Sequence, residues 1–394
     1  MEKGNGTPGL YRTGYDCCGC TACASVCPAR AILMQPDEEG FLYPHMDESL
    51  CVGCGACESV CQLKTPRTGS EPIALYAAKN RDLPTRMASS SGGVFSLLAE
   101  SVEAQGGVIY GAALDEELRV RHLRAEHREE WEAFCVSKYV QSDLGDSYMR
   151  VKRDLEEGRK VLFSGTPCQV EGLLRTLERT NTSRLLTCDV VCHGVPSPLI
   201  WGEWLRLAAE KNGRRVRSVN FRAKELTGWH HSSLVVKGEN GEILSAGTHG
   251  ENAFSRMYFR HLIIRPACHR CSYASFQRHA DITLGDYWGV EKHFPEFDDD
   301  RGVSLVICSS EKGLAAINAV RDRLDAFPIK KEQGRQPNLV HRTEEAKQRG
   351  LFWRLYRRYG LSVTMKVLRI VPVSPMEAVP VRAWRVLLRL RGEL

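Results

Sequence analysis

Eight cysteines near the start of the chain fall into two runs of identical spacing, C-x2-C-x2-C-x3-C. The runs comprise Cys17, Cys20, Cys23 and Cys27, and then Cys51, Cys54, Cys57 and Cys61. In a run of this spacing, three thiolates bind one four-iron cube and the fourth binds the other. The spacing therefore predicts two [4Fe-4S] clusters whose ligand sets cross between the runs: Cys17, Cys20, Cys23 and Cys61 for one, and Cys51, Cys54, Cys57 and Cys27 for the other.

Zinc is the alternative metal for these cysteines, because C-x2-C pairs also occur in zinc sites. Eight cysteines in this doubled order are far more specific for iron, and the repeat resembles bacterial two-cluster ferredoxins. Two features depart from that pattern: Gln62 stands where a proline is expected, and Cys18 is an extra thiol. We expect Cys18 to lie beside a cluster without binding it. The repeat predicts a module that carries single electrons and is not itself a catalyst.

A second group of cysteines is spread over the rest of the chain. Cys168 follows Thr166 at the expected start of a helix, where the helix N-terminus favours a thiolate and attracts anionic cofactor groups. Cys192 lies at the end of an apparent strand, and Cys268 and Cys271 form a C-x2-C pair. If these segments converge, the four cysteines could hold a third cubane; a zinc site or a redox dithiol are the alternatives. Three further cysteines are expected to be buried core thiols: Cys135, Cys188 and Cys308.

Strands and helices alternate in the part of the chain that must position this second group. Three apolar runs are expected to be buried strands: 161–165, 185–192 and 304–308. Thr166 caps the helix that follows the first of them, and Pro167 occupies its first position. Residues 64–72 are typical of a linker. The pattern predicts an α+β or α/β fold in which a small two-cluster ferredoxin domain precedes a larger mixed α/β domain.

The composition excludes several classes of protein. The 394 residues are 43% hydrophobic and 26% charged, which argues against disorder, collagen and coiled coil, and no stretch reaches the ~18 apolar residues of a membrane span. Residues 1–16 contain no apolar signal segment, and 16 cysteines in so long a chain favour a reducing cytoplasm over a disulfide framework. Two oxidised clusters would lower the formal charge from +6 to about +2, so the sequence predicts no nucleic-acid partner.

Several short motifs follow one another along the larger domain. They are SSGGVFS (90–96), SKYVQS (137–142), VLFSGTPCQV (161–170), CHGVPSP (192–198), FRAK (221–224), RPACHRC (265–271) and GDYWG (285–289). In this order they resemble the beta-subunit family of coenzyme F420-reducing hydrogenases and dehydrogenases. The resemblance implies that residues 73–155 and 156–330 are the N- and C-terminal parts of that domain, between a ferredoxin domain at 1–66 and a basic tail at 331–394.

The resemblance also implies an FAD-containing protein with a third [4Fe-4S] cluster on Cys168, Cys192, Cys268 and Cys271. The candidate FAD-binding residues are Ser90, Ser91, Gly92, Gly93, Lys138, Tyr139, Thr166, Asp286 and Trp288. The first four precede a helix expected over 94–104, where small residues let backbone N–H groups approach a pyrophosphate; alone, such a run is more often a turn. His193 is the candidate proton donor, with a loop-capping role as its alternative. Arg222 and Lys224 are candidates for binding an acidic substrate.

Together these features predict a cytoplasmic iron–sulfur flavoprotein oxidoreductase. It would relay electrons between the ferredoxin clusters and FAD, and on to an organic two-electron substrate such as coenzyme F420 or a polysaccharide-pathway intermediate. A flavin is needed because cubanes move one electron at a time. The alternative is a non-catalytic electron-transfer subunit that feeds a separate catalytic partner. Either hypothesis requires a redox partner protein or a small-molecule electron carrier.

The last 44 residues differ in character from the rest, with nine Arg or Lys against two Glu. Aromatic residues lie among them: Trp353, Tyr356, Tyr359 and Trp384. Residues 381–394 could form a basic amphipathic helix that contacts the inner face of a membrane. We favour the alternative, in which the tail packs on the larger domain or docks a partner.

Overall fold

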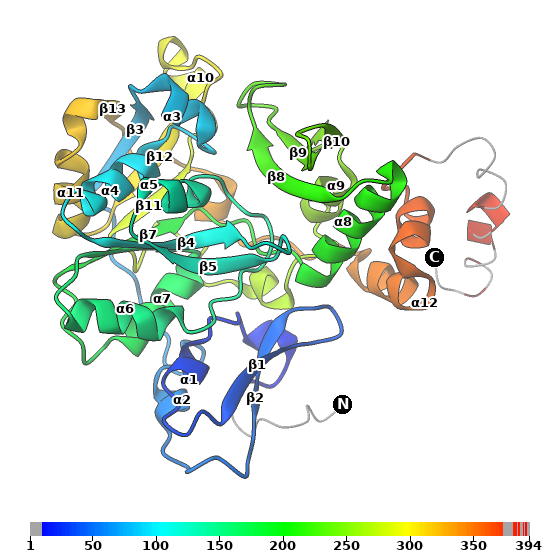
Figure 1. Cartoon of the computed structure of the whole chain (residues 1–394), viewed down its shortest axis with the longest axis horizontal. Helices are drawn as coiled ribbons and strands as arrows, with labels where there is room; N and C mark the ends of the chain where they lie inside the picture. The colour runs from blue at the N-terminus through cyan, green and yellow to red at the C-terminus, as the bar shows by residue number, and fades with distance from the viewer. Residues whose placement is uncertain (1–9, 373–380, 384, 387–388, 390, 392–394) are drawn as a thin grey trace.

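The computed structural model describes residues 10–372 and, beyond them, residues 381–383, 385, 386, 389 and 391. In Figure 1 a small N-terminal unit lies below a large sheet, and a three-stranded sheet and a C-terminal helix that is kinked at Gly360 lie to one side. This mixed α/β architecture with a small first unit is the fold class predicted from the sequence.

The N-terminal unit is built from one hairpin and two short helices. Strands β1 (Ile32–Pro36) and β2 (Leu42–Met46) pair antiparallel. Helices α1 (Ala22–Ser25) and α2 (Ala56–Ser59) each begin two residues after the second cysteine of a run, so each helix carries the third cysteine of that run. The sequence repeat is therefore also a structural repeat.

The repeat extends to the backbone torsion angles. Gly19 and Gly53 occupy equivalent positions and have φ of 70° and 65°, and the equivalent Thr21 and Gly55 have φ of 66° and 71°. These left-handed conformations turn the chain sharply within each run, which glycine permits at no steric cost. Thr21 adopts the same turn although it is β-branched, a conformation in which such residues are rare.

The large sheet has eight strands in the order β13-β3-β12-β11-β7-β6-β4-β5. The strands are β3 (Ala74–Asn80), β4 (Val108–Leu114), β5 (Val120–Ala125), β6 (Val161–Gly165), β7 (Leu185–Val190), β11 (Ile282–Asp286), β12 (Ser304–Cys308) and β13 (Leu324–Pro328). The four central strands β11, β7, β6 and β4 are parallel, and every outer pairing is antiparallel. Because parallel strands end at the same edge, the loops that follow β6, β7 and β11 lie together.

Helices cover both faces of this sheet (Figure 1). One face packs against α4 (Val94–Glu103), α5 (Arg128–Trp131) and α11 (Glu311–Asn318). The other packs against α6 (Ser147–Glu156) and α7 (Pro167–Thr176). Burial on two faces explains why the central strands are continuous apolar runs.

The structure confirms the predicted strands, except that β7 ends at Val190 instead of 192, and it confirms the start of the helix after the first of them. Thr166 is the N-cap of α7, Pro167 is its first residue, and the Thr166 N–H donates to Gln169 Oε1 at 2.9 Å. The predicted helix over 94–104 ends one residue earlier, at Glu103. The candidate flavin residue Asp286 is the last residue of β11.

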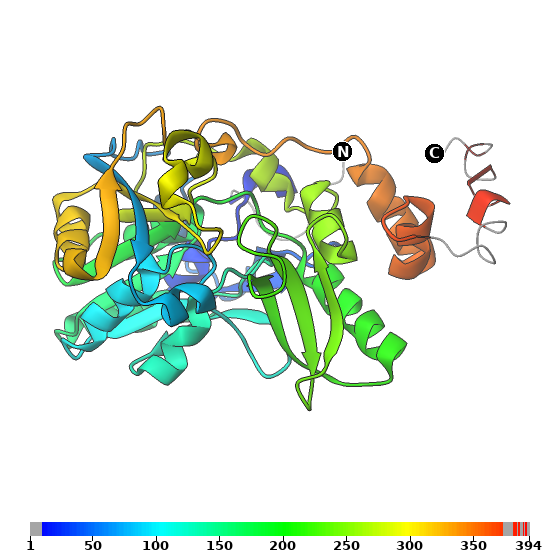
Figure 2. The same ribbon diagram turned by 90° about the horizontal axis from the view of Figure 1, so that it is seen from above.

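A second, smaller core joins the three-stranded sheet to the C-terminal helix. The sheet has the order β10-β9-β8 and comprises β8 (Val216–Ala223), β9 (Ser233–Gly238) and β10 (Ile243–Thr248). It packs with α8 (Pro198–Asn212), α9 (Ala253–Phe259) and α12 (Arg349–Val367) around one apolar cluster. Figure 2 shows this sheet and α8 between the large sheet and α12. The remaining short elements are α3 (Leu83–Ala88), α10 (Val290–His293), η1 (Gly14–Asp16), η2 (Glu132–Phe134), η3 (Pro266–Arg270), η4 (Pro295–Phe297), η5 (Arg321–Arg323) and η6 (Pro337–Leu339).

Helix α12 places part of the basic tail inside this core. Trp353 is 1% exposed, and Tyr356 packs against the same cluster and donates a hydrogen bond to Glu203 at 2.6 Å. Trp384 lies outside the described residues, as do Leu387 and Leu388, so the amphipathic helix expected at the end of the chain is untested. Among the described residues, no helix combines the length and the hydropathy that a membrane span requires.

Candidate iron–sulfur and flavin site

The first predicted cluster set lines a single cavity in the N-terminal unit. Its four cysteines come from both runs: Cys17, Cys20, Cys23 and Cys61. Apolar side chains complete the wall, among them Leu10, Ala22 and Met34. Four thiols around one cavity are the donor set that a cubane takes, so the residues present fit that group.

The second predicted set lies at the surface. Cys51 and Cys54 are exposed, and Cys27 and Cys57 are half-buried. A Cβ built on Gly53 would meet no atom within 4 Å, whereas one on the equivalent Gly19 would lie 2.9 Å from Arg265 Nη1. The two halves of the repeat therefore differ in environment: the first is covered by the large domain and the second faces solvent.

The four later cysteines converge on one further cavity, which we call the third-set cavity. Cys168 is the second residue of α7, and Cys192 follows β7. Cys268 lies in η3, and Cys271 directly follows η3. Three of the thiols have hydrogen-bond partners close to them in the chain. Thr166 Oγ1 lies 3.2 Å from the Cys168 Sγ. The Gly194 N–H donates to the Cys192 Sγ and the Tyr273 N–H donates to the Cys271 Sγ, each at 3.4 Å. Such donors stabilise thiolates, so the cavity fits a third cluster. Thr166, a predicted flavin residue, also lines this cavity.

One helix touches both of the buried cysteine sets. Cys168 stands in the first turn of α7, and Gly172 one turn later packs against Cys20. A Cβ on Gly172 would lie 3.2 Å from the Cys20 Sγ. The absence of a side chain at Gly172 thus lets the ferredoxin unit approach the backbone of α7 directly.

The two departures from the ferredoxin pattern form the contact between these cavities. Cys18 lines both of them. The Gln62 Nε2 donates to the Cys18 Sγ at 3.2 Å and to the Cys168 carbonyl at 3.1 Å, and the Gln62 Oε1 accepts from the Tyr273 hydroxyl. A proline at position 62 could make none of these bonds. The sequence marked both residues as unusual, but nothing in it showed that they meet.

The pKa values of the thiols follow burial and hydrogen bonding. Burial raises the pKa of Cys17 to about 11 and that of Cys268 to about 12. A hydrogen bond from Cys18 lowers the pKa of Cys20 to about 7, and the same thiol lowers the pKa of Cys168. Because metal ligands must be deprotonated, cluster assembly has to displace protons from the first two thiols.

Aromatic rings connect the third-set cavity to the predicted flavin residues. His193 lines the cavity, and its ring centroid lies 5.3 Å from that of Tyr258, which in turn lies 5.3 Å from that of Tyr139. His193 also approaches Asn338 Oδ1 at 3.1 Å and His261 Nε2 at 3.0 Å, and burial lowers its pKa. A neutral imidazole with both nitrogens partnered is firmly positioned, as either predicted role of His193 would require.

Three of the predicted flavin residues gather around Arg222. The Arg222 Nη2 lies 3.1 Å from Asp286 Oδ2, and its guanidinium carbon lies 5.5 Å from the ring centroid of Trp288. Tyr139 lies within electrostatic range: burial raises its pKa, and Arg222 opposes that rise. Trp288 is 39% exposed and stacks on Trp229 at 5.0 Å. Arg222 is 4% exposed, and its Nε has no hydrogen-bond partner among the described residues, so this group fits an anionic aromatic ligand.

The Ser-Gly loop lies beside this group. A Cβ on Gly92 would lie 2.4 Å from the Ala78 carbonyl, so the loop backbone is closely packed. Gly93 is the N-cap of α4 and offers no capping side chain. The Lys224 Nζ donates to the Ser91 carbonyl at 2.7 Å and to two other carbonyls, which gives it a structural role and occupies all of its donors.

Two other predicted flavin residues, Ser90 and Lys138, make hydrogen bonds to backbone groups of the protein. The Ser90 Oγ accepts from the Ser137 N–H at 2.7 Å, which joins the Ser-Gly loop to the segment that carries Lys138. The Lys138 Nζ donates to the Ala133 carbonyl, and burial lowers the pKa of Lys138 to about 8. The Lys138 ammonium is thus held by a backbone carbonyl of the protein.

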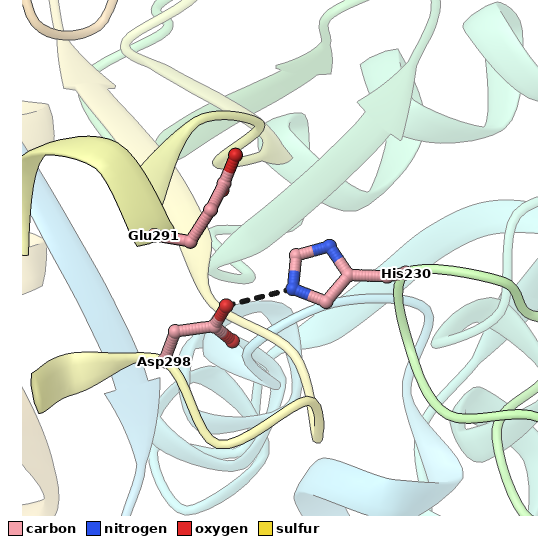
Figure 3. A group of neighbouring side chains, drawn as sticks. All are labelled: His230, Glu291 and Asp298. Atoms are coloured by element: carbon pink, nitrogen blue, oxygen red, sulfur yellow. Dashed lines mark hydrogen bonds and ion pairs between the residues drawn. The ribbon is translucent and has the colours of Figure 1, made fainter. Parts of the chain in front are cut away.

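A group of residues that the sequence did not indicate lies next to the tryptophan pair. Figure 3 shows His230, Glu291 and Asp298, whose ligand atoms all lie within 4.8 Å of one another. His230 Nε2 lies 2.7 Å from Asp298 Oδ2. His230 also approaches the Trp288 ring, at 6.2 Å between centroids.

Residues 158–332 match the family described as the C terminus of the coenzyme F420 hydrogenase/dehydrogenase beta subunit. Over these residues the chain is similar to that family. Residues 16–64 match the 4Fe-4S dicluster domain, so the first unit of the chain is an iron–sulfur domain, as predicted. Residues 73–155, predicted to be the N-terminal part of the second domain, lie outside both matches.

One similar solved structure comes from the F420-reducing [NiFe] hydrogenase complex of Methanosarcina barkeri. The two chains are 17% identical with a TM-score of 0.46, over 66% of this chain and 84% of that one. No curated protein matches the chain.

Proposed function

We propose that this chain is an iron–sulfur flavoprotein oxidoreductase that exchanges electrons between a redox partner and an organic two-electron substrate. The observation that carries the proposal is the continuity of the site. An exposed cysteine set adjoins a buried one, and α7 and Cys18 connect that set to the third. Aromatic rings in edge-on and tilted contact then lead from the third set toward Arg222. Electron carriers placed in this order would lie in consecutive contact.

The protein's own residues determine what each part can do. The exposed Cys51 and Cys54 give a partner access to the outer set. Apolar walls around the first cavity exclude water from the inner set. All 16 cysteines are free thiols, which fits a reducing compartment such as the cytoplasm.

The flavin would lie against the residues around Arg222. Arg222 would pair with its anionic groups, Trp288 and Tyr139 would contact its rings, and the start of α4 after Gly93 would face its phosphates. When bound, FAD supplies the exchange of two electrons and a proton with a substrate, which cubanes alone do not. We propose coenzyme F420 or a polysaccharide-pathway intermediate as that substrate.

One observation favours the second candidate function, an electron-transfer subunit without its own substrate. Large apolar side chains are exposed on the ferredoxin unit: Leu33, Leu50, Val52 and Leu63. Two of them, Leu50 and Val52, flank the exposed Cys51 of the outer set. Exposed apolar groups beside a redox site suit the docking of a partner protein. Both candidates share the same cysteine sets and differ only in what receives the electrons.

An electron-acceptor assay distinguishes the two functions. The full chain, anaerobically reconstituted with iron, sulfide and FAD and then reduced, should transfer electrons to coenzyme F420 or another organic acceptor when no partner is present. A protein with full iron and FAD that transfers electrons only after a partner protein is added would support the second candidate. A protein that cannot be reduced at all would contradict both.

The Ser-Gly loop provides a specific test of the flavin site. We expect the iron-loaded chain to bind about one FAD. The Gly92→Ala variant should bind FAD at least tenfold more weakly, because the new Cβ would lie 2.4 Å from the Ala78 carbonyl and displace the loop. The iron content should not change. Gly250→Ala is the control, since its Cβ would meet no atom within 4 Å. Equal FAD binding by all three proteins, measured by flavin fluorescence titration, would remove the loop from the site.

A further inference from the structure

Arg265 is a fully buried cation between the two inner cysteine sets. Its side chain is 0% exposed, and it immediately precedes η3, which carries Cys268. The Arg265 Nε donates to the Cys17 carbonyl at 2.9 Å, and its backbone carbonyl accepts from the Cys268 N–H at 3.0 Å. Arg265 therefore contacts one residue of each set.

Two arms of this guanidinium lack a protein partner. Neither Nη1 nor Nη2 has a hydrogen-bond acceptor in the described residues. One face of the group is covered by the ring of Tyr43, at 4.0 Å from the guanidinium carbon. Other buried arginines pair with carboxylates, as Arg175 does with Glu171 at 2.5 Å. The groups that most favour the charge of Arg265 are instead Tyr43 and three thiols, Cys17, Cys18 and Cys268.

A buried charge without a counter-ion is unfavourable in a protein interior. Each oxidised four-iron cube with four thiolates carries a charge of about −2, and reduction by one electron makes it more negative. Clusters on the two inner sets would therefore provide the missing negative charge. Burial opposes the more charged reduced form, and a nearby cation offsets that effect.

We propose that Arg265 is a positioning residue for electron transfer that raises the reduction potentials of the two inner clusters. The inference rests on the proposed function, since it needs clusters on both sets. Each cluster accepts one electron with no bond broken, and the guanidinium stays protonated throughout. Arg265 thus favours the inward movement of electrons from the exposed set, which it does not contact.

The test is a redox titration of the reconstituted full chain, followed by electron paramagnetic resonance. In Arg265→Gln the inner clusters should be reduced about tenfold less readily, equivalent to a potential about 59 mV lower for one electron. The signal of the exposed cluster should not move. In Arg265→Lys, which keeps the charge, the potentials should stay closer to those of the natural protein. Arg12→Gln removes an equal charge from an exposed position and should leave all potentials unchanged, because water screens it.

Unchanged inner potentials in Arg265→Gln, or an equal shift in Arg12→Gln, would overturn the proposal. If Arg265→Gln does not assemble its inner clusters, Arg265→Lys decides. Assembly with potentials that fall by less than about 59 mV supports a role for the charge, and failure of both variants to assemble assigns Arg265 a purely structural role. The proposed function fails separately, if the unaltered chain shows no cluster signals at all.

Discussion

Replacing Cys268 with serine is expected to remove about a third of the iron, leaving about eight of about 12 atoms per chain. Cys268 lines the third-set cavity with Cys168, Cys192 and Cys271, and a hydroxyl is a poor ligand for iron where a thiolate is needed. The ferredoxin cysteines line a separate cavity or the surface, so their clusters should persist. Iron analysis and electron paramagnetic resonance on anaerobic protein measure both effects.

Cys308→Ser is the matched control for that variant. Cys308 is 0% exposed in β12, within the core on one face of the large sheet. The Cys308→Ser variant makes the same chemical change outside both cavities, so we expect it to retain all of its iron. Full retention in Cys268→Ser as well would contradict a third cluster on this set. Zinc in place of the lost iron would assign a zinc site to the cavity.

Trp353→Ala is expected to lower the free energy of unfolding by about 3–5 kcal/mol, the usual cost of removing a large buried ring. Trp353 is 1% exposed and packs with Phe352 and Leu355 of the same helix against the core around α8 and β9. Loss of the ring leaves a cavity that the surrounding helices fill only in part. Chemical denaturation of the iron-loaded protein under anaerobic conditions measures the change.

Arg354→Ala tests whether burial is the cause. Arg354 is the next residue of α12 and is exposed, so its loss should change stability by less than about 0.5 kcal/mol. A cost below about 1 kcal/mol for Trp353→Ala would show that α12 is not part of the core in solution. The basic segment would then be available to a partner or a membrane surface along its whole length.

Local features of the chain were predictable because they depend on neighbouring residues. The spacing of Cys17, Cys20 and Cys23 is set within one turn of chain, so it predicts the iron–sulfur domain without any knowledge of the fold. The same holds for the strand and helix on either side of Thr166, where an apolar run, a cap and Pro167 follow directly on one another. Order and spacing of short motifs likewise predicted the family that residues 158–332 match.

Contacts between distant segments were decided only by the tertiary structure. Cys168, Cys192 and Cys268 meet because parallel strands β6 and β7 end at one edge and η3 packs against it, and no spacing rule relates residues so far apart. Likewise, the sequence shows Arg265 as one basic residue among many; its burial without a carboxylate follows from how the ferredoxin unit covers it. Sequence therefore determined which chemical groups this protein has, and packing determined which of them lie together. The reason is that the free energy of a buried charge, or of an assembled ligand set, depends on its surroundings. The chain supplies those surroundings only once it has folded.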